Sequence, residues 1–408
     1  MKVCIPSYKR YNIKTLDLLE GIDVDIFVAN ESEELIYREK YPNHNIIVGK
    51  LGIVEQRNFI TDFYNEGEII VSMDDDILKF EDRKNRPIKK MLEDACNTLK
   101  ASPLGLMTFP PHHNSYFLNG EKQQQSYSQG KYLCVGVFHI YKNDKSLKLE
   151  MPLMEDYNRA VLYMKRDGAV LRCWDILYYH KPFNEGGLTE FRNNDLHNKC
   201  VNTMLYNNPE FVSYRWRKNS PNPQLKIGKM DTKVMKLPYT DDFNQLIAFL
   251  ENTSLYGFRD NTKPAPKNQK VNNRLGFPKY RGGVLGYIYP RIGKKVFQLS
   301  RLSKLNPVLY EEVKRLGEIY CPFKFTSIQI NKNLQCPPHK DKNNNGVSML
   351  VSFGDYTGGE IVIDGETFDA RENPLIFNGS ELEHYNKPIL SGIKYSLVFF
   401  DNEGAKVC

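Results

Sequence analysis

The sequence has no apolar run that approaches the roughly 20 residues a membrane-spanning helix needs. Its opening, Met1–Ser7, reads directly as a strand, so we expect no signal peptide. The eight cysteines are scattered without a Cys-x-x-Cys pair, which argues against a disulfide framework and against a zinc finger. No internal repeat or low-complexity segment is present. We therefore expect a cytoplasmic protein without membrane association, in the host cytoplasm if the source is a virus or phage.

The length of 408 residues exceeds one average core and favours two domains. The hydrophobic share of 41% and the aromatic share of 12% are sufficient for globular packing. We place an α/β domain at residues 1–235, a connecting helix and basic linker at 236–283, and a second domain at 284–408. The net charge of +7 is modest and compatible with a polyanionic partner.

The stretch near the C-terminus that begins at Cys336 carries the clearest chemical pattern. It contains His339-Lys-Asp341, and a second histidine, His384, follows tens of residues later. Two histidines and one carboxylate in this order form the facial triad that leaves positions on Fe(II) open for a co-substrate and O₂. A bare His-x-Asp also fits a polar turn. The strand-like segments Val347–Phe353 and Lys394–Asp401 favour the metal site, because they embed the pattern in a sheet.

This region resembles the Fe(II)/2-oxoglutarate dioxygenases. The run His339 to Asn344, with Phe353-Gly-Asp-Tyr-Thr-Gly-Gly359 after it, is similar to the TET/JBP branch, which hydroxylates pyrimidine methyl groups in DNA. The resemblance implies a double-stranded β-helix (jelly-roll), Fe(II) and 2-oxoglutarate as cofactors, ascorbate as an assay reductant, and DNA as substrate. Lys394 would anchor the distal carboxylate of 2-oxoglutarate. That branch usually has Arg in this role, and no Arg follows His384. A surface lysine is the alternative reading of Lys394.

Residues 1 to about 80 alternate strand-like and helix-like segments, which predicts a Rossmann-like sheet of parallel strands. Ligands of such sheets bind at the carboxyl ends of the strands. The strand-like run from Glu68 ends there in three carboxylates, Asp74, Asp75 and Asp76. Adjacent carboxylates repel one another, and a divalent cation that bridges them to a nucleotide diphosphate relieves the repulsion. A solvated acidic turn is the alternative.

The acidic triplet resembles the Asp-x-Asp motif of GT-A glycosyltransferases, as do the opening Ile5–Arg10 and the segment from Gly52 to Arg57-Asn58. The resemblance implies a nucleotide-sugar donor and a Mn²⁺ or Mg²⁺ ion held by Asp76. Asp74 and Asp75 would contact the donor and the metal, and Arg57 would also help to bind the donor.

Further along the chain, Glu155 and Asp156 begin a segment with helical spacing. By the same resemblance either one could be the base that deprotonates an acceptor hydroxyl. Carboxylates at a helix start are also favourable for the helix dipole alone. His180 follows a strand-like segment and is a candidate third metal ligand, while the adjacent pair His112-His113 is at best part of an acceptor loop.

Two basic segments lie between the predicted domains. Tyr214-Arg-Trp-Arg-Lys218 interleaves rings and cations, which is typical of a surface that follows a nucleic-acid backbone, but also of a solvated strand edge. Asn261–Arg274 lacks acidic residues and is rich in Pro and Asn, as expected of a linker or a loop at the second domain.

The two halves together predict a bifunctional enzyme of DNA modification. The oxygenase would hydroxylate the 5-methyl group of thymine or 5-methylcytosine, and the glycosyltransferase would attach a sugar to the new hydroxyl. A buried base would have to be flipped out of the duplex to reach the iron. Two alternatives stay open: a protein-modifying enzyme of the lysyl hydroxylase–glycosyltransferase kind, and a nucleic-acid-binding protein with a degenerate oxygenase domain.

Overall fold

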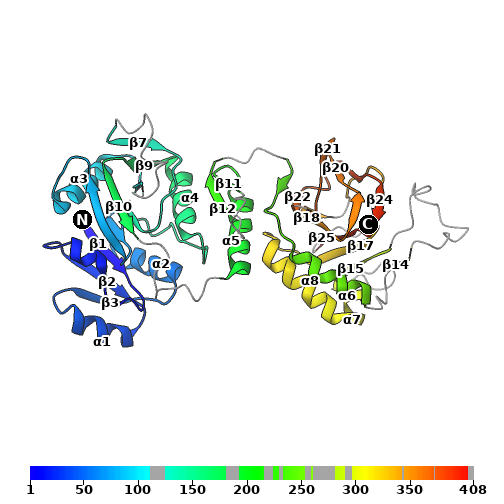
Figure 1. The fold of residues 1–408 in the computed structure, drawn as a ribbon, viewed down its shortest axis with the longest axis horizontal. Helices are drawn as coiled ribbons and strands as arrows, with labels where there is room; N and C mark the ends of the chain where they lie inside the picture. Colours follow the sequence, from blue (N-terminus) through cyan, green and yellow to red (C-terminus); the bar gives the residue numbers. More distant parts are fainter. Residues whose placement is uncertain are drawn as a thin grey trace, which may run out of the picture. The chain divides into compact units, whose positions relative to one another are not determined.

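The computed structural model describes residues 1–110, 125–180, 193–215, 224–228, 233–252, 259–260, 281–289, 296–341, 344–371 and 373–402. The chain divides into two compact units, drawn in Figure 1. The first takes Met1–Cys200, Asn208–Ser213 and Leu225–Lys229, and the second takes Val201–Asn207, Tyr214–Gln224 and Met230–Cys408. His112, His113, the core of the basic aromatic segment and Asn261–Arg274 lie outside the described residues, so the predictions for them stay predictions.

The first part of the chain alternates strands and helices up to β4 and becomes irregular after it. Its elements are β1 (Lys2–Pro6), η1 (Lys14–Leu18), β2 (Val24–Val28), α1 (Glu31–Lys40), β3 (Asn45–Val48), α2 (Ile53–Phe63), β4 (Ile69–Met73), β5 (Ile77–Asp82), α3 (Ile88–Ala101), β6 (Leu106–Thr108), β7 (Tyr127–Gly130), β8 (Phe138–Lys142), α4 (Glu155–Asp167), β9 (Val170–Cys173), β10 (Ile176–His180), α5 (Asn194–Asn207), β11 (Val212–Arg215) and β12 (Gln224–Ile227).

The central sheet has the order β3-β2-β1-β4-β8-β6-β9-β7. Strands β3, β2, β1 and β4 are parallel, as the alternation with helices predicts. Strand β8 then runs antiparallel to both β4 and β6, so the sheet is mixed rather than wholly parallel. The sequence did not reveal this change of direction, because a buried strand has the same composition whichever way it runs.

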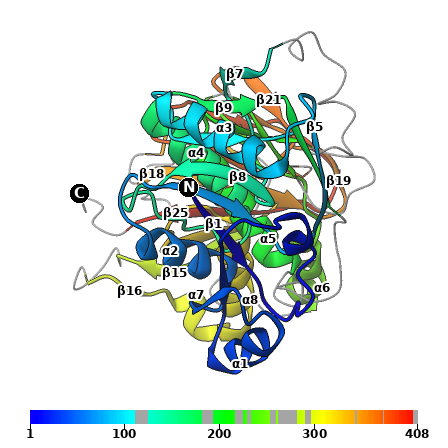
Figure 2. The same cartoon turned by 90° about the vertical axis from the view of Figure 1, so that its left-hand side faces the viewer.

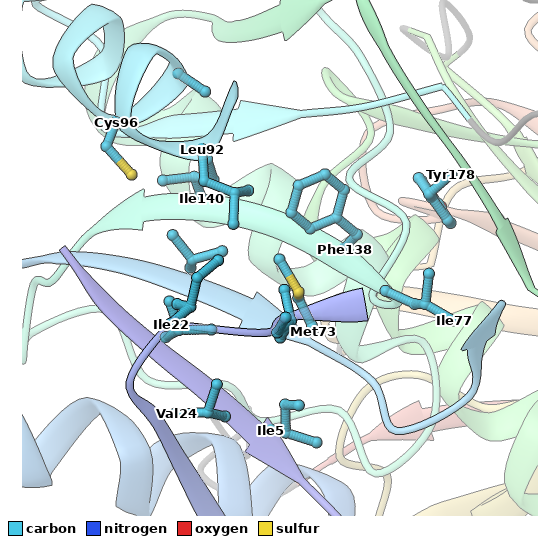
Figure 3. Close-up of a cluster of buried hydrophobic side chains, with 14 of the residues drawn as sticks. Ile5, Ile22, Val24, Met73, Ile77, Leu92, Cys96, Phe138, Ile140 and Tyr178 are labelled. Carbon is cyan, nitrogen blue, oxygen red and sulfur yellow. The ribbon is translucent and has the colours of Figure 1, made fainter. Parts of the chain in front are cut away.

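Alternate residues of these strands supply two apolar faces. Val3, Ile5, Val71 and Met73 belong to one core cluster with α3. Figure 3 shows Leu92 and Cys96 of α3 beside Ile140 of β8. On the opposite face, the ring of Phe27 packs edge-on against Phe59, Phe63 and Tyr64 at α2. Figures 1 and 2 both show α3 above β1 and α1 below it, and Tyr37 of α1 belongs to the same core cluster as α3. The opposite face is covered by α2. The sheet is therefore covered on both faces, and its functional groups gather at its edge.

The second part of the chain is mainly antiparallel. Its elements are β13 (Met235–Lys236), η5 (Asp242–Gln245), α6 (Leu246–Asn252), β14 (Arg259–Asp260), β15 (Arg281–Ile288), β16 (Gln298–Leu299), α7 (Arg301–Leu305), α8 (Pro307–Tyr320), β17 (Ser327–Lys332), β18 (Asn345–Phe353), β19 (Tyr356–Gly358), β20 (Ile361–Ile363), β21 (Glu366–Phe368), β22 (Leu375–Phe377), β23 (His384–Asn386), β24 (Ile389–Gly392) and β25 (Tyr395–Asp401).

Its large sheet has the order β13-β22-β18-β25-β17-β15-β14, with β16 beside β15. The strand pairings along this path are antiparallel. Two smaller sheets, β19-β24 and β21-β20-β23, complete the unit. The predicted strands at Val347–Phe353 and Lys394–Asp401 are confirmed as β18 and β25, which are neighbours in the large sheet.

The two faces of the large sheet pack against different partners. Val351, Leu397 and Phe399 join a core cluster with α6, α7 and α8, and Figure 1 shows these helices together below the sheet. Leu350, Leu375 and other alternate residues instead join Ile361 and Ile363 of the small sheet. The strands and turns around His339, Asp341 and His384 are therefore held in place by two separate hydrophobic cores. Among the described residues, no helix is both long and apolar enough to cross a membrane.

Candidate active sites in the two units

The backbone brings His339 and His384 together directly. Each residue donates its N–H to the carbonyl of the other, at 3.1 and 3.0 Å, which forms an isolated antiparallel bridge. Their ring centroids are 4.3 Å apart. The nearest oxygens of Asp341 lie 3.8 Å from Nε2 of each histidine. The three predicted ligands thus converge, and in the described part of the chain they are the sole group of three whose ligand atoms lie within 4.8 Å of one another.

The other ring nitrogen of each histidine is held by the backbone. Nδ1 of His339 is 2.8 Å from the carbonyl of Pro337, and Nδ1 of His384 is 3.0 Å from the carbonyl of Leu382. A carbonyl only accepts, so each Nδ1 carries a proton, and in the neutral tautomer that this selects Nε2 is the nitrogen with the free lone pair. Burial, and to a smaller extent the proximity of His339, lower the pKa of His384. Neutral imidazoles oriented in this way are suited to bind a metal ion.

Asp341 is positioned by the turn that precedes the second histidine. Its N–H donates to the carbonyl of Gly379 at 2.8 Å, and Asn344 Nδ2 donates to its Oδ2 at 3.1 Å. A Cβ at Gly379 would lie 2.8 Å from Asp341 Oδ2 and 3.3 Å from Cε1 of His384. Two neutral imidazoles and one carboxylate beside a position without a side chain fit Fe(II). Neither Gly379 nor Asn344 was predicted from the sequence, although Gly379 belongs to an Asn-Gly-Ser turn just ahead of His384.

Lys394 comes immediately before β25 and is buried, with 4% of its surface exposed. Its Nζ donates to the carbonyl of Gly359 and lies 5.6 Å from the ring centroid of Tyr356. Burial lowers the pKa of Lys394 to about 8, although Asp369 and Glu360 act in the opposite direction. The Cys336 thiol, three residues before His339, is also near enough to affect this pKa. Because it is buried, Lys394 is not a surface lysine.

In the first unit, the acidic triplet follows β4 beside the end of β1. Because these strands are parallel neighbours, their carboxyl ends meet at one edge of the sheet. Arg10, beyond β1, places a single nitrogen, Nη1, 2.8 Å from Asp75 Oδ1 and 2.9 Å from Asp76 Oδ2. Ser7 Oγ donates to the second oxygen of Asp75 at 2.6 Å. Asp76 Oδ1 is buried and finds no hydrogen-bond partner among the described residues.

Arg57 of α2 connects the triplet to the predicted bases. Its Nη1 donates to Ser72 Oγ at 3.1 Å, and its Nη2 donates to Asp74 Oδ1 at 3.0 Å and to the carbonyl of Gly136 at 3.1 Å. A Cβ at Gly136 would meet Glu155 Oε1 at 3.2 Å and Nη2 of Arg57 at 3.4 Å. Arg57, Asp74 and Glu155 therefore lie together although they are far apart in sequence. Gly136 carried no recognisable signal in the sequence.

Glu155 and Asp156 occupy the first two positions of α4. Burial, followed by the charge of Glu155, raises the pKa of Asp156 to about 7. Burial likewise raises the pKa of Asp74 to about 7, with Arg57 opposing the shift and the other acidic groups adding to it. Carboxyls whose pKa lies close to neutrality can accept and release a proton at physiological pH. The raised pKa is compatible with the predicted role of Asp156 as a base.

His180 ends β10, which pairs with β5 so that His180 lies opposite Ile77. It is thus next to the residue that follows Asp76. Within the described ranges, however, His180 does not form with the aspartates a group of three whose ligand atoms lie within 4.8 Å. Its role as a metal ligand stays a prediction. Arg10, by contrast, already occupies the space between Asp75 and Asp76, so these residues do not fit the predicted Mn²⁺ or Mg²⁺ ion as they stand.

Residues 1–187 match the model of a family described as TET-associated glycosyltransferase. Among solved structures, the chain is similar to NgTET1 in complex with 5mC DNA, at 14% identity and a TM-score of 0.32, over 53% of this chain and 93% of that one. It is also similar to a 2OG-Fe(II) oxygenase family oxidoreductase from Burkholderia pseudomallei, at 17% identity and a TM-score of 0.29, over 43% and 88% of the two chains.

A third similar structure is CMP:2-keto-3-deoxy-manno-octonic acid synthetase complexed with CTP, at 10% identity and a TM-score of 0.28, over 47% of this chain and 93% of that one. No curated protein matches the chain. Structural likenesses of this size identify no activity. Evidence about function comes instead from the family match over residues 1–187 and from the site residues themselves.

Proposed function

We propose that the chain is a bifunctional enzyme that hydroxylates a pyrimidine 5-methyl group in DNA and then transfers a sugar to the product. The observation that carries the proposal is the convergence of His339, Asp341 and His384 in a chain whose first 187 residues match a TET-associated glycosyltransferase family. An iron site in one unit and a glycosyltransferase in the other suit two consecutive reactions, since the first product carries the hydroxyl that the second consumes.

In the second unit, His339, Asp341 and His384 would hold Fe(II) through two Nε2 atoms and one carboxylate oxygen. Fe(II) bound there would supply the chemistry for oxidation of the methyl C–H bond by O₂, coupled to conversion of 2-oxoglutarate to succinate and CO₂. The carbonyls of Pro337 and Leu382 keep both imidazoles in the tautomer that binds metal. Lys394 would hold the distal carboxylate of 2-oxoglutarate, because a buried ammonium gains a partner for its charge when an anion binds.

In the first unit, the acceptor hydroxyl would attack the anomeric carbon of a nucleotide sugar. Glu155 or Asp156 would take its proton, since the pKa of Asp156 is raised to about 7 and lies close to the working pH. Arg57 donates to Asp74 of the triplet and to the carbonyl of Gly136, the residue beside Glu155, and would thus help to position the base relative to the donor site.

The test is the full-length protein with Fe(II), 2-oxoglutarate, ascorbate and a mixture of nucleotide sugars, on DNA that contains thymine and 5-methylcytosine. Nucleosides would be analysed by mass spectrometry after digestion. We expect one nucleoside to gain an oxygen, or an oxygen and a sugar. DNA that stays unmodified while 2-oxoglutarate is consumed would contradict the DNA assignment and lead to peptide substrates.

Two matched variants separate the reactions. Asp341→Ala should abolish hydroxylation and leave glycosylation of pre-hydroxylated DNA intact, because it removes one iron ligand from the second unit alone. Asp76→Ala should have the reverse effect. If either variant abolishes both reactions, the assignment of one reaction to each unit is wrong.

A further inference from the structure

We propose that Arg10 supplies the positive charge that stabilises the departing nucleoside diphosphate, in the place where GT-A enzymes of the Asp-x-Asp type use a divalent cation. The inference rests on the proposed glycosyl transfer and deepens it. It makes this half of the reaction independent of Mn²⁺ or Mg²⁺, and it assigns Arg10 as a binding residue for the donor.

The guanidinium of Arg10 lies between the carboxylates of Asp75 and Asp76. One nitrogen of Arg10 bridges Asp75 and Asp76, at 2.8 and 2.9 Å, which is the position a cation shared by the two carboxylates would take. The remaining oxygen of Asp75 is already bonded to Ser7, and that side chain is 5% exposed. A divalent ion could bind both aspartates only after Arg10 had left. The position is built into the fold, because β1 and β4 are paired strands that end side by side.

The guanidinium of Arg10 carries a positive charge that the neighbouring aspartates stabilise. Burial alone would lower the pKa of Arg10, but Asp75, Asp76 and Asp74 outweigh it and raise the pKa. The guanidinium is therefore charged at any pH at which the protein is folded. It also neutralises part of the repulsion among the three carboxylates, which is the task that the sequence analysis gave to a metal ion.

The side chain of Arg10 is partly exposed, so a ligand can reach it. The Arg10 side chain is 22% exposed, whereas that of Arg57 is 3% exposed and both of its terminal nitrogens are already bonded. Among the described residues Arg10 uses only Nη1 in hydrogen bonds, so its second terminal nitrogen is free for phosphate oxygens. The paired donors of an arginine match the geometry of phosphate. Asp76 Oδ1, buried and unpartnered, can accept a hydrogen bond from a hydroxyl of the sugar.

The proposed step is balanced without a metal ion. The acceptor oxygen forms a bond to the anomeric carbon as the bond from that carbon to the diphosphate oxygen breaks, and the electron pair leaves with the diphosphate. The acceptor proton passes to Glu155 or Asp156. The additional negative charge on the nucleoside diphosphate develops beside Arg10, which stabilises it as a preorganised charge does in other active sites.

The first experiment measures metal binding and needs no activity. Because the iron site would also take up Mn²⁺, the protein carries His339→Ala and Asp341→Ala, and free Mn²⁺ is followed by electron paramagnetic resonance. We expect no Mn²⁺ to bind at micromolar concentrations. Arg10→Gln in the same background should create a Mn²⁺ site, because it empties the space between Asp75 and Asp76, while Arg10→Lys should not. Stoichiometric Mn²⁺ binding to the protein that retains Arg10 would overturn the proposal.

The second experiment measures anion binding. Inorganic pyrophosphate, used as the probe in the presence of EDTA, should bind by calorimetry. Arg10→Gln should weaken that binding about 10- to 100-fold, the range for loss of charge-assisted hydrogen bonds, and Arg10→Lys should weaken it less. Equal affinity in wild type and Arg10→Gln would overturn the proposal, because the phosphates would then be held elsewhere.

The third experiment keeps this inference separate from the proposed function. Transfer to DNA that contains a hydroxymethylated pyrimidine should proceed in EDTA at the rate seen with added Mn²⁺. Transfer that requires Mn²⁺ would overturn the role of Arg10 and leave the glycosyltransferase assignment standing. Absence of transfer under every condition, with any nucleotide sugar, would overturn both.

Discussion

Lys394 is a buried lysine, and the protonation of its amine should control the affinity for 2-oxoglutarate. Burial lowers the pKa of Lys394 to about 8. Above that pH the ligand-free protein holds a neutral amine, so the dissociation constant of 2-oxoglutarate should rise, approaching tenfold per pH unit. The constant is measured by titration of the anaerobic Fe(II) protein between pH 6.5 and 9.5. A flat profile would mean that another group binds the distal carboxylate.

Lys394→Arg is the matched control, because arginine keeps its charge over this range and should flatten the profile. The same group also affects stability. Between pH 8 and the ordinary pKa of 10.5, the unfolded chain holds more protons on Lys394 than the folded chain does. The contribution of Lys394 to the free energy of unfolding should therefore increase as the pH rises through this window.

Gly379 should control iron affinity through its lack of a side chain. In Gly379→Ala the new Cβ would lie 2.8 Å from Asp341 Oδ2, so the ligand must move. We expect metal affinity to fall about 10- to 100-fold, as for other groups that position metal ligands, with little change in thermal stability of the metal-free protein. Gly365→Ala is the control. A Cβ at Gly365 would meet no other atom within 4 Å, but the residue has a φ of +86°. The substitution should therefore lower the free energy of unfolding by about 1–2 kcal/mol and leave metal affinity unchanged.

At the residue scale, sequence reasoning found the groups that react better than the groups that position them. His339, Asp341 and His384 could be predicted because a fixed spacing of metal-binding residue types is rare by chance. Gly379 and Gly136 could not, because a glycine next to a ligand looks like any turn glycine until the fold places the two together. Arg10 was part of a predicted nucleotide-binding segment, but its bridge to two aspartates arises from strand pairing that the sequence does not display.

At the element scale, Gly317 shows how close helix α8 approaches the sheet. A Cβ at this position would lie 2.5 Å from Cε1 of Phe399 and 2.6 Å from Cζ of Phe325. Helix propensity alone predicts that Gly317→Ala gains about 1 kcal/mol. Overpacking against two rings costs about 1–3 kcal/mol, so we expect a net loss of stability in urea unfolding. In the Phe325→Leu background the loss should be smaller. A gain in stability in both backgrounds would show that the rings yield easily.

Helices and strands with a regular apolar pattern were predicted well, but the turns that divide two of them were not. The spacing of apolar residues over 300–320 predicts one amphipathic helix, but α7 ends at Leu305 and α8 begins at Pro307. Proline favours the first turn of a new helix, and Asn306 is bonded back to Leu302. The strand-like segment that precedes His180, residues 170–179, is likewise divided into β9 and β10. A local turn breaks each element without disturbing the apolar pattern on which the prediction relied.

At the scale of the whole molecule, the mixed α/β first unit and the antiparallel second unit agree with the predicted order of fold classes. Residues 1–187, which match the TET-associated glycosyltransferase family, belong to the first of them. The reversal of β8 within the first sheet was beyond prediction, because direction depends on connections rather than on composition.

The presence of both units in one chain should affect how much intermediate is released. Wild-type protein is compared with an equimolar mixture of Asp341→Ala and the double variant Glu155→Gln/Asp156→Asn, each deficient in one reaction. Because a tether raises the local concentration of the second site to the order of mM, the mixture should release a larger share of hydroxylated, unglycosylated nucleoside. The share is measured by mass spectrometry at low enzyme concentration. Equal shares would mean that the tether confers no advantage.

The backbone bridge between His339 and His384 has a consequence for the biogenesis of the protein. On the ribosome, the segment with the first histidine emerges well before the one with the last, and the two pair only when β23 is available. A nascent chain interrupted before that point would hold an incomplete set of ligands. Fe(II) would then be acquired only after β23 has been synthesised, and products truncated before β23 would not bind it at this site.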